Sequence, residues 1–205
     1  MPFFVRHGLS EWKDRMNAAY NKIDKAHAAS FQFINGSEGE LARAGILRVF
    51  ELFCWQGKMN SSSVFLDLGS GLGKPSYLAA MVGVAESYGV EISGSLVKYA
   101  RESLEVVGQK DVKIIQADIC KWIYTTKAKM LNLTHVYAFS TAYNKKTRAA
   151  IFAYLRGRVG VFFATFMRPR TVSQELDVTV FGFVEQPQLK ASTSKYNCYL
   201  YKIEG

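Results

Sequence analysis

An acidic residue opens a short run that contains three glycines, about a third of the way along the chain. The run is Asp67-Leu-Gly-Ser-Gly-Leu-Gly73, and it overlaps a short apolar segment, residues 64–68, that is typical of a buried strand. Because glycine has no Cβ atom, Gly69, Gly71 and Gly73 let the backbone turn sharply and approach a ligand closely. A second carboxylate, Glu91, ends the next apolar segment about 20 residues past the central glycine. This spacing is typical of a nucleotide site in which the second carboxylate accepts hydrogen bonds from both ribose hydroxyls.

The acid at position 67 indicates which ligand suits this turn. The glycine pattern differs from the G-x-G-x-x-G of dinucleotide folds, and a carboxylate at the strand end repels a pyrophosphate. The same carboxylate attracts positive charge, such as the ammonium and sulfonium groups of S-adenosyl-L-methionine. A phosphate-binding P-loop is excluded, since Lys74 is followed by Pro75 and not by Ser or Thr. An ordinary strand-turn-helix connection with chance glycines is the alternative interpretation.

A third carboxylate, Asp118, follows the expected strand at residues 112–116. Its place in Gln116-Ala-Asp-Ile119 puts it at the same sheet edge as the other two acids. The alternative is that Asp118 only caps a short helix that begins before Cys120.

Alternating strands and helices must position these residues. Strands are expected over residues 64–68, 87–91, 112–116, 134–139 and 159–165, with helices over residues 75–84, 94–107, 120–129 and 145–156. Alternating segments near residues 176–185 and 195–203 have no helix between them and predict an antiparallel pair. The pattern predicts an α/β fold with a Rossmann-like seven-stranded sheet of the class I methyltransferase type: five parallel strands plus an antiparallel terminal pair.

The chain begins with an expected helical cap. Apolar residues at helical spacing predict helices over residues 10–29 and 40–55, joined by a loop at residues 31–39. A length of 205 residues suits a single domain. We therefore expect residues 1–60 to pack as a cap on a core of residues 61–205.

The composition indicates which partners and which cellular compartment suit the chain. Lys and Arg number 26 against 17 acids, a formal charge of +9 that favours a polyanionic partner, although a merely basic protein fits equally well. Neither the three cysteines nor the three histidines have a spacing that suggests a disulfide framework or a metal site. No segment has the length of a membrane helix or the composition of a signal peptide, so a soluble intracellular protein is expected.

Several segments together resemble one family, the Dot (disruptor of telomeric silencing) non-SET histone H3 lysine methyltransferases. The segments are Gly39-Glu-Leu41 before an apolar helix, the glycine-rich run from Phe65 to Gly73, Tyr88-Gly-Val-Glu91, and the closing strand from Tyr196 to Glu204. The resemblance covers roughly residues 31–203. It implies S-adenosyl-L-methionine as the cofactor and a histone or a nucleosome as the partner. It also implies a nuclear location, with the cytoplasm as the second choice.

The resemblance also implies roles for individual residues. Asp67 and the backbone of residues 69–71 would hold the methionine part of the cofactor, and Glu91 would hold the ribose. Asp118 and Ile119 would contact the adenine, while Glu38 or Glu40 would close over the ligand. The full set of cofactor-binding candidates is Glu38, Glu40, Asp67, Gly69, Ser70, Gly71, Gly73, Glu91, Ile92, Asp118 and Ile119.

One segment departs from the family pattern. After the fourth strand the family has Asn-Asn-Phe lining the lysine channel, whereas this chain has Phe139-Ser-Thr141 followed by Ala142 and Tyr143. The channel chemistry is therefore altered, and the candidates for the channel are Phe139, Ser140, Thr141 and Tyr143. Basic residues beyond the fourth and fifth strands are candidates for contact with a polyanionic substrate, including nucleic acid: Lys145, Lys146, Arg148, Arg168 and Arg170.

Three functions remain open at this point. The first is a protein-lysine methyltransferase of the Dot type that acts on histone or another basic nuclear protein. The second is a class I methyltransferase acting on RNA or a small molecule, although no Asp/Asn-Pro-Pro-Tyr/Phe motif follows the fourth strand. The third is a catalytically silent cofactor-binding subunit, which the altered channel segment favours.

Overall fold

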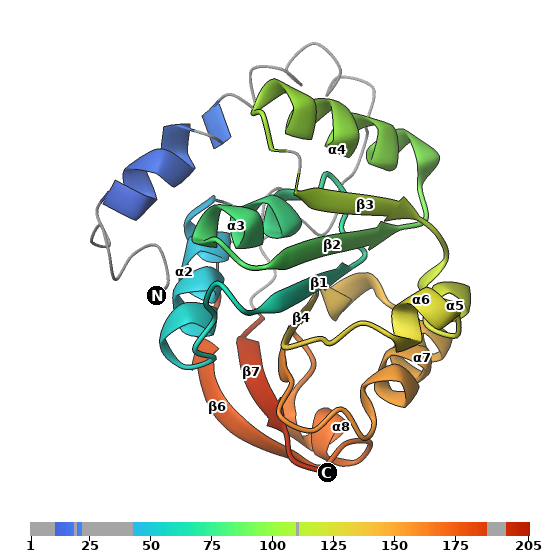
Figure 1. Cartoon of the computed structure of the whole chain (residues 1–205). Helices are drawn as coiled ribbons and strands as arrows, with labels where there is room; N and C mark the ends of the chain where they lie inside the picture. The colour runs from blue at the N-terminus through green and yellow to red at the C-terminus, as the bar shows by residue number, and fades with distance from the viewer. Residues whose placement is uncertain (1–10, 19, 22–42, 110, 188–195) are drawn as a thin grey trace.

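Seven strands form one sheet with helices on both faces (Figure 1). The computed structural model describes residues 11–18, 20–21, 43–109, 111–187 and 196–205. The strands are β1 Val64–Leu68, β2 Glu86–Glu91, β3 Val112–Gln116, β4 His135–Ala138, β5 Phe162–Thr165, β6 Val178–Val184 and β7 Cys198–Ile203. They lie in the order β3-β2-β1-β4-β5-β7-β6, and β7 runs antiparallel to both of its neighbours while β1 to β5 are mutually parallel. The expected α/β class and seven-stranded sheet are confirmed.

The helix α2 precedes β1, and the helices α3 to α8 lie between successive strands. They are α2 Arg43–Trp55, α3 Lys74–Val82, α4 Gly94–Val106, α5 Ile119–Trp122, α6 Thr126–Lys129, α7 Lys145–Leu155 and α8 Pro169–Ser173, with a 3₁₀ turn η2 at Ser140–Ala142. The single helix expected over residues 120–129 is two short helices, because Thr125 caps the second one by accepting a hydrogen bond from the Ala128 N–H. The short α8 was not expected. Residues 11–18 and 20–21 are helical, and the expected loop at 31–39 lies outside the described residues.

The core has one layer on each face of the sheet. On the α2 and α3 side, the rings of Phe50, Phe53 and Phe65 contact one another with centroids 5.7 to 5.9 Å apart. Trp12 and Met16 belong to the same buried cluster, so the amino-terminal helical residues share the core of the sheet. The opposite layer contains α5, α7 and α8 side chains, and every residue of β1 is buried between the two layers.

The strand register aligns the carboxyl ends of the parallel strands. Leu68 of β1 pairs with Val90 of β2 and Ala138 of β4, and Ala138 pairs in turn with Thr165 of β5. The residues that follow these strands therefore emerge along one edge, where ligands bind in open parallel sheets. In the described part of the chain no helix is long and apolar enough to cross a bilayer.

Candidate active site

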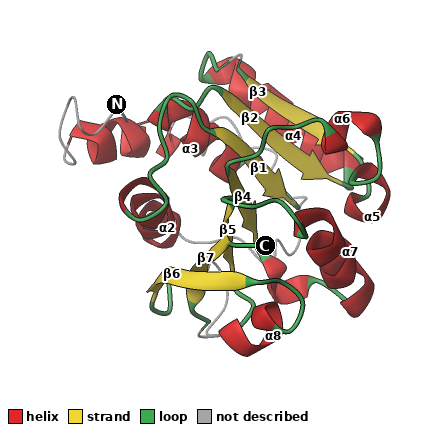
Figure 2. Cartoon of the chain, turned by 60° about the horizontal axis from the view of Figure 1, so that its bottom comes forward, coloured by secondary structure: helices red, strands yellow, loops and turns green. Residues whose placement is uncertain are grey.

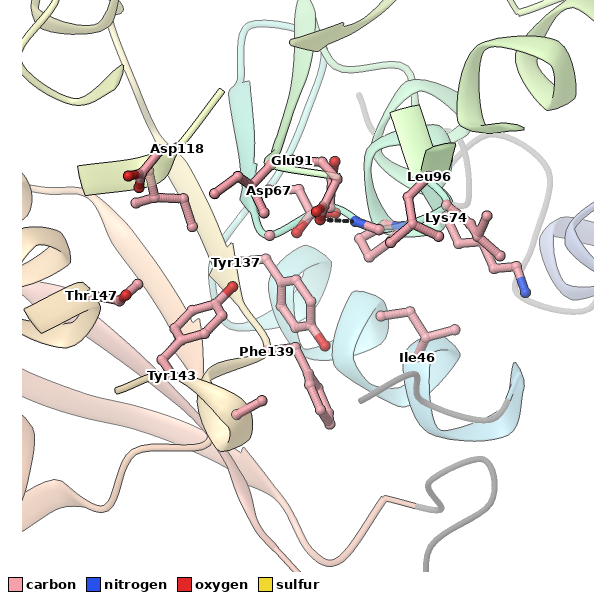
Figure 3. Close-up of a pocket in the computed structure, with 18 of the residues that line it drawn as sticks. Ile46, Asp67, Lys74, Glu91, Leu96, Asp118, Tyr137, Phe139, Tyr143 and Thr147 are labelled. Carbon is pink, nitrogen blue, oxygen red and sulfur yellow. Dashed lines mark hydrogen bonds between the residues drawn. The ribbon is translucent and has the colours of Figure 1, made fainter. Parts of the chain in front are cut away.

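A cavity of about 440 Å³ opens at this carboxyl edge (Figure 3). Its wall combines the turn after β1, the ends of β2, β3 and β4, and the beginning of α7. Among the residues expected from sequence, those that line it are Asp67, Gly69, Ser70, Gly71, Glu91, Ile92, Asp118, Ile119, Phe139 and Tyr143. Candidates that come from four separate segments of the chain therefore face a single cavity.

The glycine-rich turn has a backbone that favours glycine. Gly69, Gly71 and Gly73 have φ angles of 77°, 52° and 75°, in the left-handed region. The N–H groups of Gly69 and Ser70 both donate to the carbonyl of Val90, at 2.8 and 3.0 Å. Gly73 does not line the cavity: a Cβ atom there would lie 3.2 Å from Ile114 Cδ1, so this glycine lets α3 begin close to the sheet.

Glu91 joins the turn to the second strand. Its Oε2 accepts a hydrogen bond from the Gly71 N–H at 2.9 Å, and its Oε1 accepts one from the Ser93 N–H at 2.8 Å. The side chain is buried and faces the cavity (Figure 3). Because a carboxylate has about four acceptor sites, Glu91 can still accept hydrogen bonds from two ligand hydroxyls.

Asp67 lies at the base of the cavity and is 1% exposed. Among the described residues neither of its carboxylate oxygens has a hydrogen-bond partner, and the same is true of the buried Ser70 hydroxyl. Burial, with a smaller contribution from the nearby Glu91 carboxylate, raises the pKa of Asp67 well above its ordinary value. An unpartnered buried carboxylate is costly, so the site favours either a proton or a cationic ligand group at this position.

The unliganded protein should therefore lose stability as the pH rises through the folded-state pKa of Asp67. The folded state holds this proton more tightly than the unfolded chain, so the stabilisation is complete below the unfolded pKa of about 3.9 and is lost above the raised one. The Asp67→Asn variant lacks this titrating group. We therefore expect the free energy of unfolding of the variant to rise relative to that of wild type as the pH increases, by at most about 1.4 kcal/mol per pH unit. Urea denaturation of both proteins between pH 5 and 9 measures this difference. A difference that stays the same at every pH would contradict the prediction.

Asp118 caps a helix and also lines the cavity. Its Oδ1 accepts a hydrogen bond from the Cys120 N–H at 2.8 Å, which caps α5, and the residue also lines the cavity. The capping bond uses only part of the acceptor capacity of the carboxylate. A ligand donor can therefore still bind to Asp118, with Ile119 beside it.

The expected channel segment divides into two pairs. Phe139 and Tyr143 line the cavity; Phe139 packs edge-on against Phe166 at 4.7 Å, and the Tyr143 hydroxyl donates a hydrogen bond to the carbonyl of Leu68. Ser140 and Thr141 are not among the lining residues. The 3₁₀ turn places the buried Ser140 hydroxyl 2.8 Å from the Thr165 hydroxyl, and Thr141 is exposed.

The five basic candidates do not line the cavity. Glu38 and Glu40 fall outside the described residues. The basic residues Lys145, Lys146, Arg168 and Arg170 are exposed and Arg148 is half-buried, at the beginnings of α7 and α8 on the same edge of the sheet.

Further lining residues were not expected from sequence. They are Tyr20, Ile46, Leu72, Lys74, Pro75, Leu96, Tyr137, Ala142 and Thr147. Tyr137 is the most informative, because it pairs with Asp67 across β1 and β4 and its pKa is raised well above the ordinary value by burial. The ammonium of Lys74 lies 5.5 Å from the centre of the Tyr20 ring. A signal for Lys74 was present in the sequence, since it directly follows the last glycine.

Comparison with protein families identifies the chain. The family model described as "Histone methylation protein DOT1" matches residues 29–136, which is more than half of the 205 residues. The chain belongs to the DOT1 family. It is therefore a methyltransferase, and its cofactor is S-adenosyl-L-methionine, as the sequence resemblance implied. The matched range contains Asp67, Glu91 and Asp118 and ends before Phe139.

Solved structures confirm the methyltransferase fold of this DOT1-family chain. MtNAS, solved in complex with MTA and tNA, has a TM-score of 0.59 and 14% identity, over 99% of this chain and 74% of that one. A candidate RNA methyltransferase of Pyrococcus horikoshii, PH1948, has a TM-score of 0.59 and 15% identity, over 80% and 85% of the two chains. TrmK of M. capricolum, solved with S-adenosyl-homocysteine, has a TM-score of 0.57 and 12% identity, over 76% and 67%. The comparison with curated proteins gave no match.

The cavity of this DOT1-family chain fits the cofactor chemically. The unpartnered Asp67 carboxylate suits the ammonium group, and the remaining acceptor sites of Glu91 suit ribose hydroxyls. No cluster of His, Cys, Asp or Glu side chains that could hold a metal ion occurs within the described ranges. The carboxylate acceptors of Asp67 and Glu91 suit an organic cation that carries hydroxyl groups.

Proposed function

We propose that this chain is a protein-lysine N-methyltransferase of the Dot type that acts on histone or another basic protein in the nucleus. The observation that carries the proposal is an aromatic wall beside Asp67, formed by Tyr137, Phe139 and Tyr143 within a cavity of a DOT1-family chain. These side chains supply the apolar surroundings that a lysine side chain needs in order to lose its proton.

The proposed cofactor contacts follow the cavity wall. Asp67 binds the ammonium group, with the backbone of residues 69–71 alongside, and Glu91 binds the ribose hydroxyls. Asp118 accepts a hydrogen bond from the adenine, and Ile119 covers its face. When bound, S-adenosyl-L-methionine supplies a methyl group on a sulfonium sulfur.

Methyl transfer to an amine is an in-line displacement, so the chain mainly aligns the acceptor and excludes water. A lysine with an ordinary pKa of about 10.4 must react as the neutral amine. Removal from water and the adjacent sulfonium charge both favour that neutral form. Phe139 and Tyr137 carry out this desolvation, and the mechanism needs no separate catalytic base.

We also propose that residues 1–60 act as a cap that completes this cavity, with residues 61–205 as the methyltransferase core. Tyr20 and Ile46, which line the cavity, both come from the cap, and both belong to the core cluster that includes Phe65 of β1. The cap and the sheet thus share one packed interior, so the acceptor channel depends on both segments.

An RNA acceptor is the second candidate function. It is favoured by the net charge of +9 and by a family match that ends before the channel segment. A catalytically silent cofactor-binding subunit is the third.

The transfer of tritium from labelled S-adenosyl-L-methionine distinguishes these candidates. Nucleosomes, free core histones and total RNA are each incubated with the purified protein, with Asp67→Ala as the inactive variant and Asp111→Ala, an exposed acid outside the cavity, as its matched control. We expect label in histone H3 that Asp67→Ala loses and Asp111→Ala keeps. Label in RNA alone would replace the proposal by the RNA acceptor, and cofactor binding without any label would favour the silent subunit.

A further inference from the structure

A second surface on the carboxyl edge combines an exposed and a half-buried aromatic ring with arginines. Phe183 of β6 and Tyr199 of β7 are register partners with ring centroids 6.0 Å apart, and Tyr199 lies 6.1 Å from Tyr201. Tyr201 is fully buried, whereas Phe183 is 56% exposed. The three rings form a row that begins in the core at Tyr201 and ends in solvent at Phe183. The exposed Phe183 ring is therefore held in place by its contact with Tyr199.

Two arginines, Arg168 and Arg170, follow the residue that contacts the buried end of this row. The Tyr201 hydroxyl donates a hydrogen bond to the carbonyl of Met167 at 2.8 Å, and the next residue, Arg168, begins the turn of α8. The helix α8 packs beside β6 (Figure 2). Arg168 and Arg170 are exposed, and none of the ion pairs described for the chain involves them. We call Phe183, Tyr199, Arg168 and Arg170 the aromatic-arginine surface.

The register fixes the position of this surface relative to the cavity. Tyr199 pairs with Thr165 of β5, which pairs with Ala138 of β4, the residue before Phe139. Three strand spacings separate β4 from β6, which is about 14 Å. The surface therefore lies on the same edge as the cavity but contains no residue of its wall.

We propose that the aromatic-arginine surface binds a single-stranded nucleic acid. The bases stack on Phe183 and Tyr199, and the phosphates are neutralised by Arg168 and Arg170. An exposed ring face beside cations suits unstacked bases, whereas the bases of a duplex already stack on one another and leave no face for a side chain. The net charge of +9 adds long-range attraction to any polyanion.

One acidic residue opposes this attraction. Glu185 follows Phe183 by two positions and is exposed. If nucleic acid binds here, removal of this charge by Glu185→Gln strengthens binding. This expected gain cannot be produced by a variant that merely unfolds.

The inference does not depend on lysine as the methyl acceptor. Oligonucleotide binding and histone labelling are measured separately, so either can fail while the other holds. Retention of the wild-type cofactor affinity shows that each variant used below is folded.

Fluorescence anisotropy with a labelled oligouridine of 20 nucleotides, and with an RNA duplex of the same length, tests the stacking. Because each stacked base contributes about 1–3 kcal/mol, Phe183→Ala should weaken oligouridine binding by about fivefold or more. The control is Tyr124→Ala, which removes an aromatic side chain that is 60% exposed elsewhere and should have no effect. Equal affinity for the duplex, or an unchanged affinity in Phe183→Ala, would overturn the proposal.

The salt dependence of the same titration tests the arginines. The double variant Arg168→Gln, Arg170→Gln should reduce the slope of log affinity against log salt by about 1.4, since each phosphate contact on a single strand contributes about 0.7. The control is Lys127→Gln, Lys129→Gln, which makes the same charge change at two exposed positions of α6. Equal slopes in the two double variants would overturn the assignment to this surface, as would nucleosome binding without any oligouridine binding.

Discussion

Glu91→Ala should weaken the binding of S-adenosyl-L-methionine by about 100-fold or more. Hydrogen bonds to a charged group contribute about 1.5–3 kcal/mol each, and the variant loses those proposed to the two ribose hydroxyls. It also loses the bonds that Glu91 accepts from the N–H groups of Gly71 and Ser93, so the glycine-rich turn is no longer held in place before the ligand arrives. Isothermal titration calorimetry measures the dissociation constant directly.

The matched control for this variant is Glu86→Ala, at the opposite end of the same strand. Glu86 is bound to the Tyr88 hydroxyl and to the ammonium of Lys113, and it does not line the cavity. It should leave the cofactor affinity unchanged. An affinity loss of equal size in both variants would mean that β2 as a whole had been perturbed and that Glu91 had no specific role.

Glu91→Gln separates the contribution of the proposed ribose hydrogen bonds from that of the backbone bonds that hold the glycine-rich turn. The amide has a single acceptor oxygen, so it can keep only one of the two backbone bonds, and its NH₂ group cannot accept from ribose. We expect an affinity between those of wild type and Glu91→Ala. A wild-type affinity in Glu91→Gln would contradict the assignment of Glu91 as an acceptor of ligand hydroxyls.

Local sequence signals predicted which residues line the cavity wherever those residues lie at strand ends. β1 has the expected bounds, because an apolar run is flanked by three serines and by the glycine-rich turn. Once the strands are parallel, Asp67, Glu91 and Asp118 must emerge on one edge whatever the details of packing. The order of the strands along the sequence was therefore enough to predict that these three acids lie around one cavity.

Residues that depend on long-range pairing could not be predicted in this way. Tyr137 faces the cavity only because β4 pairs with β1 in the register that sets it beside Asp67. Ser140 is turned towards Thr165 by the 3₁₀ turn, and no periodicity in Phe139-Ser-Thr-Ala142 indicates that turn. Both outcomes depend on contacts between residues at least 25 positions apart, which lie beyond the range of local patterns.

Gly69→Ala should be more destabilising than Gly71→Ala, although both glycines have positive φ angles, of 77° and 52°. The backbone strain of a side chain in the left-handed region is common to both, at about 1–2 kcal/mol. A Cβ atom at position 71 would meet nothing within 4 Å, whereas at position 69 it would overlap the Tyr143 hydroxyl and lie 3.1 Å from Tyr143 Cζ. Overpacking of this kind costs a further 1–3 kcal/mol or so.

The double variant Gly69→Ala, Tyr143→Phe tests the cause of that difference. Tyr143→Phe alone loses the hydrogen bond to the Leu68 carbonyl, at a cost of about 1 kcal/mol, but it also removes the atom that the new Cβ overlaps. We therefore expect the double variant to be more stable than the sum of the single changes predicts, by about 1 kcal/mol or more in urea denaturation. If the two changes in unfolding free energy simply add, the Tyr143 ring moves aside from the new Cβ atom at no cost. A positive coupling would identify Tyr143 as the side chain that fixes the glycine-rich turn from the channel side, so that the acceptor channel and the cofactor site share one structural element.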